Sequence, residues 1–320
     1  MLAVVIPAYR SRDQILDVLS RIPEYVDRVF VIDDLCPERT GKTVQLSCKD
    51  KRVSVHFNDK NLGVGGAVIV GFKLALDAGA SVVVKIDSDG QMDPAQIINL
   101  LSPIYSARAD YAKGNRFNSL EDLQAMPKVR VFGNAALSLL SKISSGYWSV
   151  NDPTNGFFAI TRGALQNISL GKLRTRWFFE SDLLFRLAIA RAVVIDVPIA
   201  AKYGSETSNL RAYKVVFPFL WRHLVNFVKR ILYLYYLREW SVASFQLPAS
   251  LTLLGSGMFL GLSYWSQSAA AGQATTTGQV MLAVLPILIG FQLLLSFLGL
   301  DVANEPRQPL YVNRQNESGA

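Results

Sequence analysis

The chain has 320 residues, half of them apolar, and a formal net charge of +8 at neutral pH. This length leaves room for one large or two small globular domains. The excess basic residues gather in front of an apolar C-terminal region instead of spreading over the chain, which argues against nucleic acid as a partner.

The first part of the chain alternates apolar, β-branched runs with stretches of helical periodicity. The strand-like runs are 2–6, 28–32, 53–57 and 81–86, and the helical stretches include 14–22 and 67–78. This alternation predicts an α/β fold, Rossmann-like, with a mostly parallel sheet and helices on both faces. Ligands of such sheets bind beyond the carboxyl ends of the strands, where we expect the functional site.

Polar residues follow the second predicted strand at Asp33 and Asp34. Their carboxylates could accept hydrogen bonds from a nucleobase or ribose hydroxyl, or they could cap the segment after Pro37. The glycine-rich stretch 61–67 departs from the G-x-G-x-x-G pattern. We interpret its glycines as allowing a helix to pack closely on the sheet.

The fourth predicted strand runs into Asp87-Ser88-Asp89-Gly90-Gln91. Two carboxylates so close together repel each other unless a cation screens them. Carboxylate and amide oxygens suit Mg²⁺ or Mn²⁺, which usually also bind phosphate oxygens of a substrate. The segment therefore indicates either a metal-bridged diphosphate site or a solvated acidic turn, with Asp93 capping a helix that begins at Pro94.

Residues 116–200 are less regular. A helical pattern covers 129–144, and a strand is expected at 193–197. Between them, Asp152 precedes a proline and Gly156 follows four residues later, which predicts a tight turn that presents Asp152. The two histidines, His56 and His223, are isolated in the sequence, and we assign neither a function.

The C-terminal region has no charged residue between Ser241 and Leu300. Two apolar stretches, 245–266 and 279–300, are each about 22 residues long, enough to cross a bilayer as helices. A buried soluble hairpin is the alternative, although such long soluble helices normally carry a charged face. Small residues in the first span would allow two hairpins to associate into a homo-oligomer. They are Gly255, Gly257 and Gly261.

Basic residues precede the first span, and the loop between the spans has none. They are Lys202, Arg211, Lys214, Arg222, Lys229, Arg230 and Arg238. The positive-inside rule then places the head and the tail in the cytoplasm. Residues 210–240 read as an amphipathic connector in the membrane interface, broken or kinked at Pro218, with Arg222, Asn226, Lys229 and Arg230 on one face toward headgroups. A helix packed on the head is the alternative.

These boundaries divide the chain into four parts. They are a globular domain (1–209), the basic connector (210–240), the two transmembrane helices (241–302) and a cytoplasmic tail (303–320).

Five short motifs occur in one order along the chain. They are Val5-Ile6-Pro7-Ala8-Tyr9, Val31-Ile32-Asp33-Asp34, Asn61-Leu62-Gly63, Asp87-Ser88-Asp89-Gly90-Gln91 and Asp152-Pro153-Thr154-Asn155-Gly156-Phe157. With these motifs the chain resembles the family 2 glycosyltransferases of the GT-A fold. Within that family it is similar to the polyprenyl-phosphate glycosyltransferases related to dolichol-phosphate mannose synthase, in the bacterial form with two C-terminal transmembrane helices.

The resemblance implies inverting sugar transfer from a nucleotide-diphosphate sugar to a polyprenyl phosphate such as undecaprenyl phosphate. The reaction would occur on the cytoplasmic leaflet of a bacterial inner membrane, with a UDP-sugar as the favoured donor and GDP-mannose as the second candidate. Matching positions imply catalytic roles for Asp152 and Asp89. They also imply binding of Mg²⁺ or Mn²⁺ by Asp87, Asp89 and Gln91, of the nucleotide by Pro7, Tyr9, Asp33, Asp34 and Asp87, and of the acceptor phosphate by Arg116 and Arg130.

The acceptor chemistry determines what Asp152 has to do. A phosphate monoester is largely ionised at neutral pH, so it needs positioning by arginines more than deprotonation. We therefore expect Asp152 to orient an arginine or the acceptor. Two alternatives remain open: transfer to a lipid hydroxyl, which would make Asp152 an essential base, and a non-catalytic membrane scaffold, against which the retained Asp87 and Asp89 argue.

Overall fold

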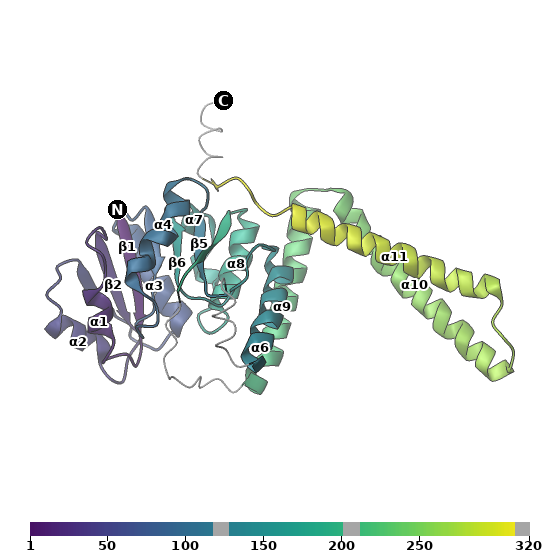
Figure 1. Ribbon diagram of the computed structural model, residues 1–320, viewed down its shortest axis with the longest axis horizontal. Coiled ribbons are helices and arrows are strands. Elements are labelled where there is room, and N and C mark those ends of the chain that lie inside the picture. Colours follow the sequence, from purple (N-terminus) through teal and green to yellow (C-terminus); the bar gives the residue numbers. More distant parts are fainter. Residues whose placement is uncertain (118–127, 201–211, 311–320) are drawn as a thin grey trace, which may run out of the picture. The chain divides into compact units, whose positions relative to one another are not determined.

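The computed structural model describes residues 1–117, 128–200 and 212–310. The chain forms two units, one of Met1–Arg230 joined by the segment that starts at Pro306, and one of Ile231–Glu305. Figure 1 shows the elements of both units in chain order.

The first unit is built on a seven-stranded sheet with the order β3-β2-β1-β4-β6-β5-β7. The strands are β1 (Leu2–Ala8), β2 (Arg28–Asp33), β3 (Val53–Phe57), β4 (Val82–Lys85), β5 (Tyr111–Asn115), β6 (Phe158–Thr161) and β7 (Val194–Pro198). Only β6 runs antiparallel to its neighbours, β4 and β5. The predicted, mostly parallel sheet is confirmed.

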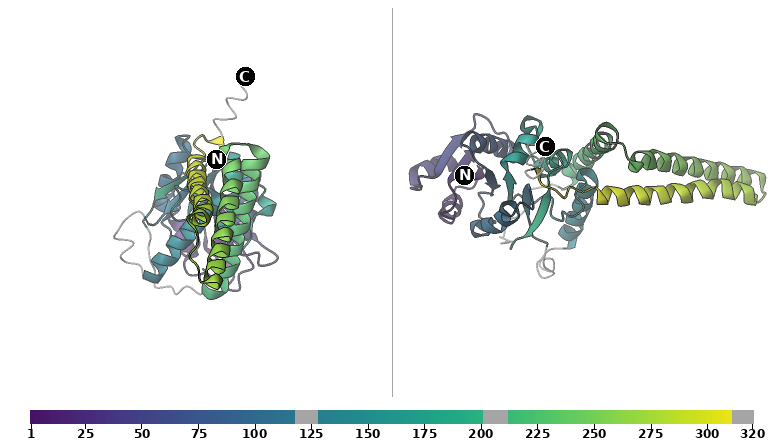
Figure 2. Two further views of the ribbon diagram at one scale, coloured as in Figure 1. Left: turned by 90° about the vertical axis from the view of Figure 1, so that its right-hand side faces the viewer. Right: turned by 90° about the horizontal axis from the view of Figure 1, so that it is seen from above.

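Helices cover both faces of this sheet, as predicted (Figures 1 and 2). They are α1 (Ile15–Ser20), α2 (Thr40–Ser47), α3 (Val64–Asp77), α4 (Ile97–Tyr105), α7 (Arg162–Asn167) and α8 (Phe179–Ile189), with 3₁₀ turns at Pro94–Gln96 and Leu170–Lys172. Helix α6 (Lys128–Ser145) packs on α8. Alternate strand residues face opposite layers. Val5 packs in the core under α3 and α8, while Val4 packs in the core under α1 and α4.

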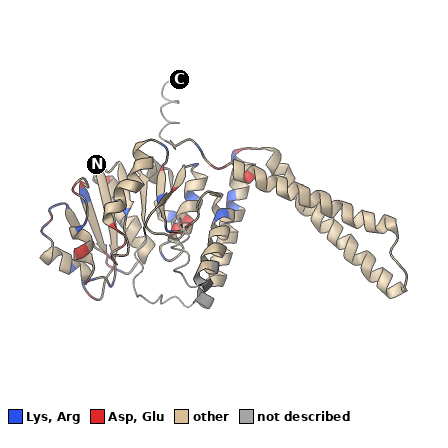
Figure 3. Ribbon diagram, viewed as in Figure 1, with Lys and Arg blue, Asp and Glu red and all other residues tan. Residues whose placement is uncertain are grey.

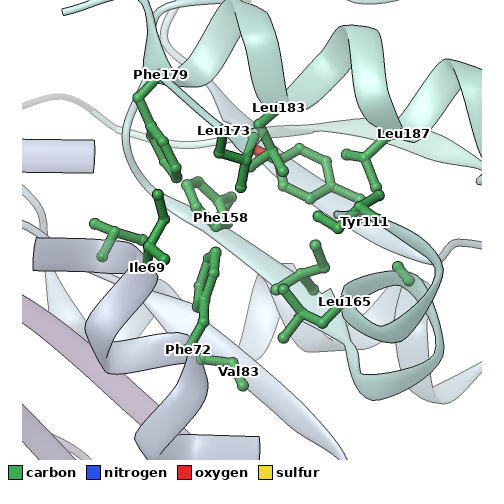
Figure 4. Packing of buried hydrophobic residues seen from close by; sticks show 14 of the residues in the cluster. Ile69, Phe72, Val83, Tyr111, Phe158, Leu165, Leu173, Phe179, Leu183 and Leu187 are labelled. Carbon is green, nitrogen blue, oxygen red and sulfur yellow. The ribbon is translucent and has the colours of Figure 1, made fainter. Parts of the chain in front are cut away.

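Aromatic rings fill the core under α3 and α8 (Figure 4). Phe158 packs between Phe72, at a centroid distance of 6.3 Å, and Tyr111, at 4.9 Å. Gly71 lets α3 approach β1, because a Cβ there would lie 2.2 Å from Val5 Cγ1. The glycine-rich stretch itself has a different role from the one expected, because a Cβ at Gly65 would lie 2.7 Å from the carbonyl of Arg174 and from Phe179 Cβ, so its close contacts are with the segment that leads into α8 and not with the sheet.

The reversed strand β6 determines where the turn before it lies. Its first residue, Phe158, pairs with Lys85, the last residue of β4, and with Lys113 of β5. The beginning of an antiparallel strand lies beside the ends of its neighbours. The segment 152–157 therefore reaches the same edge of the sheet as the loop that follows β4.

Helix α9 (Ala212–Leu232) packs on the first unit through its polar side chains. His223 Nδ1 lies 2.7 Å from Ser144 Oγ, Asn226 Nδ2 donates to Asp182 Oδ1, and Arg230 Nη2 donates to the carbonyl of Ile143 at 2.9 Å. His223, Asn226 and Arg230 are buried. The side chains left exposed on this helix are largely apolar, and they include Phe217, Leu220, Trp221, Leu224 and Val228.

This packing corrects the expected headgroup face of the connector. Asn226 and Arg230 point into the protein, and Arg222 stacks over the Phe178 ring at 5.7 Å, whereas Lys229 is exposed. Helical spacing correctly puts Asn226 and Arg230 on one face of the helix. That face is turned toward the protein because Asn226 binds Asp182 on α8 and Arg230 binds the carbonyl of Ile143 on α6. Pro218 does not interrupt the helix, which is followed by a π-helical turn at Tyr233–Arg238.

The second unit contains two long antiparallel helices, α10 (Val242–Ala271) and α11 (Thr277–Ala303), which lie side by side (Figures 1 and 2). Both are long and apolar enough to cross a membrane, and Figure 3 shows almost no charge along them. They extend beyond the expected spans 245–266 and 279–300. Gly257 serves contacts inside this hairpin, since a Cβ there would lie 2.7 Å from the carbonyl of Ala283, whereas Gly255 has open space.

The chain returns to the first unit after α11. The backbone N–H of Leu310 donates to both carboxylate oxygens of Asp110, at 3.1 and 3.0 Å, and Asp110 also accepts from the N–H of Val193. Leu310 packs against the core under α3 and α8. The first unit therefore includes chain on both sides of the hairpin in the sequence.

The burial of His223 makes stability depend on pH. Burial lowers the pKa of its imidazole to about 4. Because a histidine in the unfolded chain titrates near 6.5, stability should fall as the pH falls from about 6.5 to 4, by about 2 kcal/mol between pH 7.5 and pH 5.

The check is thermal unfolding of the detergent-solubilised protein at both pH values. His223→Gln should remove most of this pH dependence, and the exposed His56→Gln should leave it intact. An unchanged pH dependence in His223→Gln would contradict the assignment.

Candidate active site at the carboxyl edge of the sheet

The carboxyl edge of the sheet holds the loops that follow the parallel strands β1, β2, β3 and β4. The turn before the reversed strand β6 lies at the same edge. A hydrogen bond of 2.7 Å between Ser11 Oγ and Ser88 Oγ ties the first of these loops to the acidic turn. Both serines are buried.

The two carboxylates after β2 bind backbone N–H groups. Asp33 accepts from Cys36 and Gly41, each at 2.7 Å. Asp34 accepts from Asn58 Nδ2 and from the N–H groups of Leu62 and Gly63, at 2.7 to 2.8 Å. Both are buried. Asp33 thus binds the start of the helix that follows Pro37, in line with the expected alternative, whereas Asp34 binds the loop after β3 instead. Nucleotide contact by Asp33 and Asp34 stays a prediction.

The β1 side of the edge contains an exposed aromatic ring. Tyr9 is exposed, with the guanidinium of Arg10 over its ring at 5.4 Å, whereas Pro7 is buried in β1. An open pocket lies at the end of β3, lined by His56–Lys60 and Leu62. The sequence indicated this loop as part of the edge but not its hollow shape.

The acidic turn after β4 is partly exposed. Asp87 Oδ1 lies 2.6 Å from the ammonium of Lys85, and Asp89 Oδ1 accepts from the N–H of Gln91 at 3.0 Å. Asp93 caps the following turn by accepting from the N–H of Ala95 at 3.2 Å, as predicted.

No group of three or more His, Cys, Asp or Glu gathers around a metal position within the described ranges. The donor set is instead two carboxylates and an amide oxygen, from Asp87, Asp89 and Gln91. Such a set fits a hard divalent cation that takes its remaining ligands from substrate phosphates and water.

Asp152 is buried and locked by an arginine. Its carboxylate accepts from Arg116 Nε at 2.7 Å and from Arg116 Nη2 at 3.0 Å, and the N–H of Arg116 lies 3.3 Å from Oδ2. Burial alone would raise the pKa of Asp152, but the bonds from Arg116 and the charge of Lys113 hold it below its usual range. Asp152 is therefore an ionised carboxylate that positions a guanidinium.

Arg116 is partly exposed, and its guanidinium lies 5.7 Å from the Phe117 ring centroid. Arg130 belongs to α6, but its side chain lies outside the described residues, so its expected role at the acceptor phosphate stays a prediction.

Charged residues beneath the edge received no role at the site from the sequence; Lys113 is buried, and Asp196 and Glu180 are partly buried. Lys113 donates to the carbonyl of Asp152, and burial lowers its pKa to about 8. Asp196 accepts from the N–H of Asn151 at 2.7 Å, and burial raises its pKa to about 6. Burial also raises the pKa of Glu180, although the charge of Lys85 opposes this shift. A lysine in an otherwise apolar strand, such as Lys85 in β4, was the sequence signal that could have revealed a buried charge here.

Comparisons with known proteins identify the family of the chain. Residues 3–169 match the model of glycosyl transferase family 2. The chain belongs to this family. It is 28% identical over 233 residues to a UDP-N-acetylglucosamine–dolichyl-phosphate N-acetylglucosaminyltransferase of Methanococcus voltae, covering 68% of this chain and 92% of the relative. It is 30% identical over 199 residues to an undecaprenyl-phosphate mannosyltransferase of Micrococcus luteus, covering 61% and 81%.

The solved structures support the fold. Glucosyl-3-phosphoglycerate synthase from Mycobacterium tuberculosis, crystallised with Mn²⁺, UDP and glucosyl-3-phosphoglycerate, matches with a TM-score of 0.52 at 18% identity. The match covers 72% of this chain and 79% of that one. The expected GT-A fold and the expected family are thus confirmed.

The bonds of Asp34 lead to a test of the loop that follows β3. Asp34→Ala removes the acceptor for the N–H groups of Leu62 and Gly63, which should destabilise the protein by about 1–3 kcal/mol and weaken UDP binding. Chemical denaturation and UDP titration measure the two effects. The exposed Asp77→Ala at the end of α3 is the matched control, and equal behaviour of the two variants would refute the role of Asp34.

Proposed function

We propose that this protein transfers a sugar, with inversion, from a nucleotide-diphosphate sugar to a polyprenyl phosphate at a membrane surface. The observation that carries the proposal is the Asp152–Arg116 pair. A buried carboxylate with a depressed pKa and two guanidinium bonds is a poor general base. An acceptor that is already ionised needs no base, and a lipid phosphate is such an acceptor.

Arg116 then has a defined task. Asp152 holds the inner edge of its guanidinium, and the partial exposure of the side chain leaves room to meet an anionic group at the site. Arginine suits this task because its planar group binds phosphate oxygens in pairs. Arg130 on α6 is the second arginine that we assign to the acceptor phosphate.

The donor side requires stabilisation of a leaving nucleoside diphosphate. We assign Asp87, Asp89 and Gln91 to a Mg²⁺ or Mn²⁺ ion, because their oxygens suit a hard cation with an incomplete protein cage. When bound, such an ion neutralises charge that develops on the diphosphate as the glycosidic bond breaks. The structural neighbours crystallised with UDP and Mn²⁺ or Mg²⁺ support this assignment.

The nucleotide is assigned to the β1 and β2 side of the edge. Tyr9 would contact the base, while Pro7, Asp33 and Asp34 would shape the pocket for base and ribose. A UDP-sugar is the favoured donor, since the relative from Methanococcus voltae is named for a UDP-sugar and the structural neighbour holds UDP. GDP-mannose is the second candidate, because other relatives are named for mannose transfer.

Two independent features support a position of the protein at a membrane. The second unit has two helices long and apolar enough to cross a bilayer. Helix α9 uses its polar side chains to pack on the globular unit and exposes Trp221, Leu224 and Val228, the reverse of a helix on a water-soluble domain. With the basic residues before the spans, this supports catalysis at the cytoplasmic leaflet of a bacterial inner membrane, with undecaprenyl phosphate as acceptor.

Two substitutions separate the acceptor classes. Asp89→Asn should lower turnover by at least about 100-fold, because it removes a charged ligand of the proposed cation. Asp152→Asn should lower turnover by only about tenfold and raise the KM for the acceptor, because it loosens Arg116 without removing a base.

The assay is sugar transfer to undecaprenyl phosphate by purified protein with Mg²⁺ or Mn²⁺. Equal and complete loss in both variants would favour a hydroxyl acceptor, such as a diacylglycerol, with Asp152 as essential base. Failure of the wild type to bind any nucleotide sugar would favour a non-catalytic scaffold.

The exposed face of α9 predicts a defect specific to membrane-borne acceptor. The double substitution Trp221→Glu and Leu224→Glu should raise the KM for polyprenyl phosphate in vesicles by about tenfold, because charges on this face oppose insertion into the interface. The KM for a short, water-soluble prenyl phosphate should stay unchanged. Leu46→Glu, on the exposed side of α2, is the matched control, and equal KM values for the lipid in both variants would contradict the interfacial position.

A further inference from the structure

Two buried lysines lie on either side of one aromatic residue beneath the site. Lys85 of β4 and Lys113 of β5 both pair in register with Phe158 of the reversed strand β6. Val83 and Tyr111, two residues before them, pack in the core under α3 and α8, so strand alternation places both lysines on that face. Each is almost completely buried. A buried ammonium is costly unless it is paired, so each lysine must serve a partner.

The two lysines serve different partners. Lys113 binds a backbone carbonyl, that of Asp152. Lys85 forms an ion pair of 2.6 Å with Asp87, the first carboxylate of the acidic turn. The side chain of Asp87 is partly exposed, whereas the lysine that pairs with it is buried.

Gly156 reserves the space for this ion pair. A Cβ at this position would lie 2.2 Å from Lys85 Nζ and 2.9 Å from Asp87 Oδ2. The backbone of Gly156 is not in the left-handed region, so the requirement for glycine is one of space. The Asp152–Gly156 turn and the acidic turn are thereby joined through Lys85, although the sequence separates them by more than sixty residues.

We propose that Lys85 is a positioning residue that offsets the charge of Asp87, so that a divalent cation binds tightly only together with the donor diphosphate. The inference rests on the proposed function. With Lys85 present, the turn that contains Asp87 and Asp89 carries the net charge of a single carboxylate. Cation affinity rises with the number of charged ligands, so the turn alone binds weakly, and the diphosphate supplies the missing charge and oxygens. Cation and donor then bind with positive coupling, and each strengthens the other equally.

The test measures Mn²⁺ binding to the full chain in detergent by the electron paramagnetic resonance signal of free Mn²⁺, with and without UDP. Wild type should bind Mn²⁺ weakly alone and at least about tenfold more tightly with UDP. Lys85→Met, which keeps the length of the side chain but removes its charge, should tighten UDP-free Mn²⁺ binding on the order of fivefold. The strengthening by UDP should shrink by the same factor. Lys73→Met, on the exposed side of α3, is the matched control and should bind as wild type.

A second variant tests the same pair without changing any charge. Gly156→Ala should separate the ammonium from Asp87, because the added Cβ would lie 2.2 Å from Lys85 Nζ and 2.9 Å from Asp87 Oδ2, and the closer contact moves the flexible lysine most. It should shift UDP-free Mn²⁺ binding in the same direction as Lys85→Met, but less. Unchanged or weaker UDP-free Mn²⁺ binding in both variants overturns the inference. If only one variant folds, its result decides. Absence of Mn²⁺ binding to wild type even with UDP would instead contradict the metal-dependent function itself.

Discussion

Buried charge beneath the carboxyl edge of the sheet is the constraint on which the site depends. Lys85, Lys113 and Asp152 are almost completely removed from water, and each is held by a partner. In a low-dielectric surrounding an unpaired ion would be expelled or neutralised, so these groups fix one another's positions. The result is an acidic turn and an arginine whose side chains are each held by a buried partner of opposite charge.

The reversed strand β6 brings these charges together. In an all-parallel sheet, the turn that contains Asp152 would lie at the opposite edge from Asp87. Because β6 runs antiparallel between β4 and β5, its preceding turn lies at the carboxyl edge, and Phe158 stands between the two lysines. One change of strand direction therefore brings the Asp152 turn to the same edge of the sheet as the acidic turn after β4.

Helix α9 presents its polar residues to the globular unit. Its buried side chains are held by hydrogen bonds to α6 and α8, and the face left outside is mainly apolar. Polar contacts are directional, so they fix the rotation of the helix about its axis, whereas apolar contacts with lipid would not. The segment after α11 binds Asp110, so the globular unit holds the chain both before and after the hairpin.

The sequence alone was enough to predict the class of the sheet and the two long apolar helices, and to recognise the five motifs. All of these depend on local periodicity and on residues next to each other along the chain. It placed Asp93 as a cap for the same reason, whereas the expectation that Asp152 orients an arginine came from the chemistry of the implied acceptor. It did not reveal the partners of Lys85, Lys113, Asn226 or Arg230. Those partners lie on strands and helices far away in the chain, and only the tertiary structure decides which of them share a buried environment. For the same reason the polar face of α9 turned out to face the protein: its periodicity specifies that two faces exist, and packing decides which one is buried.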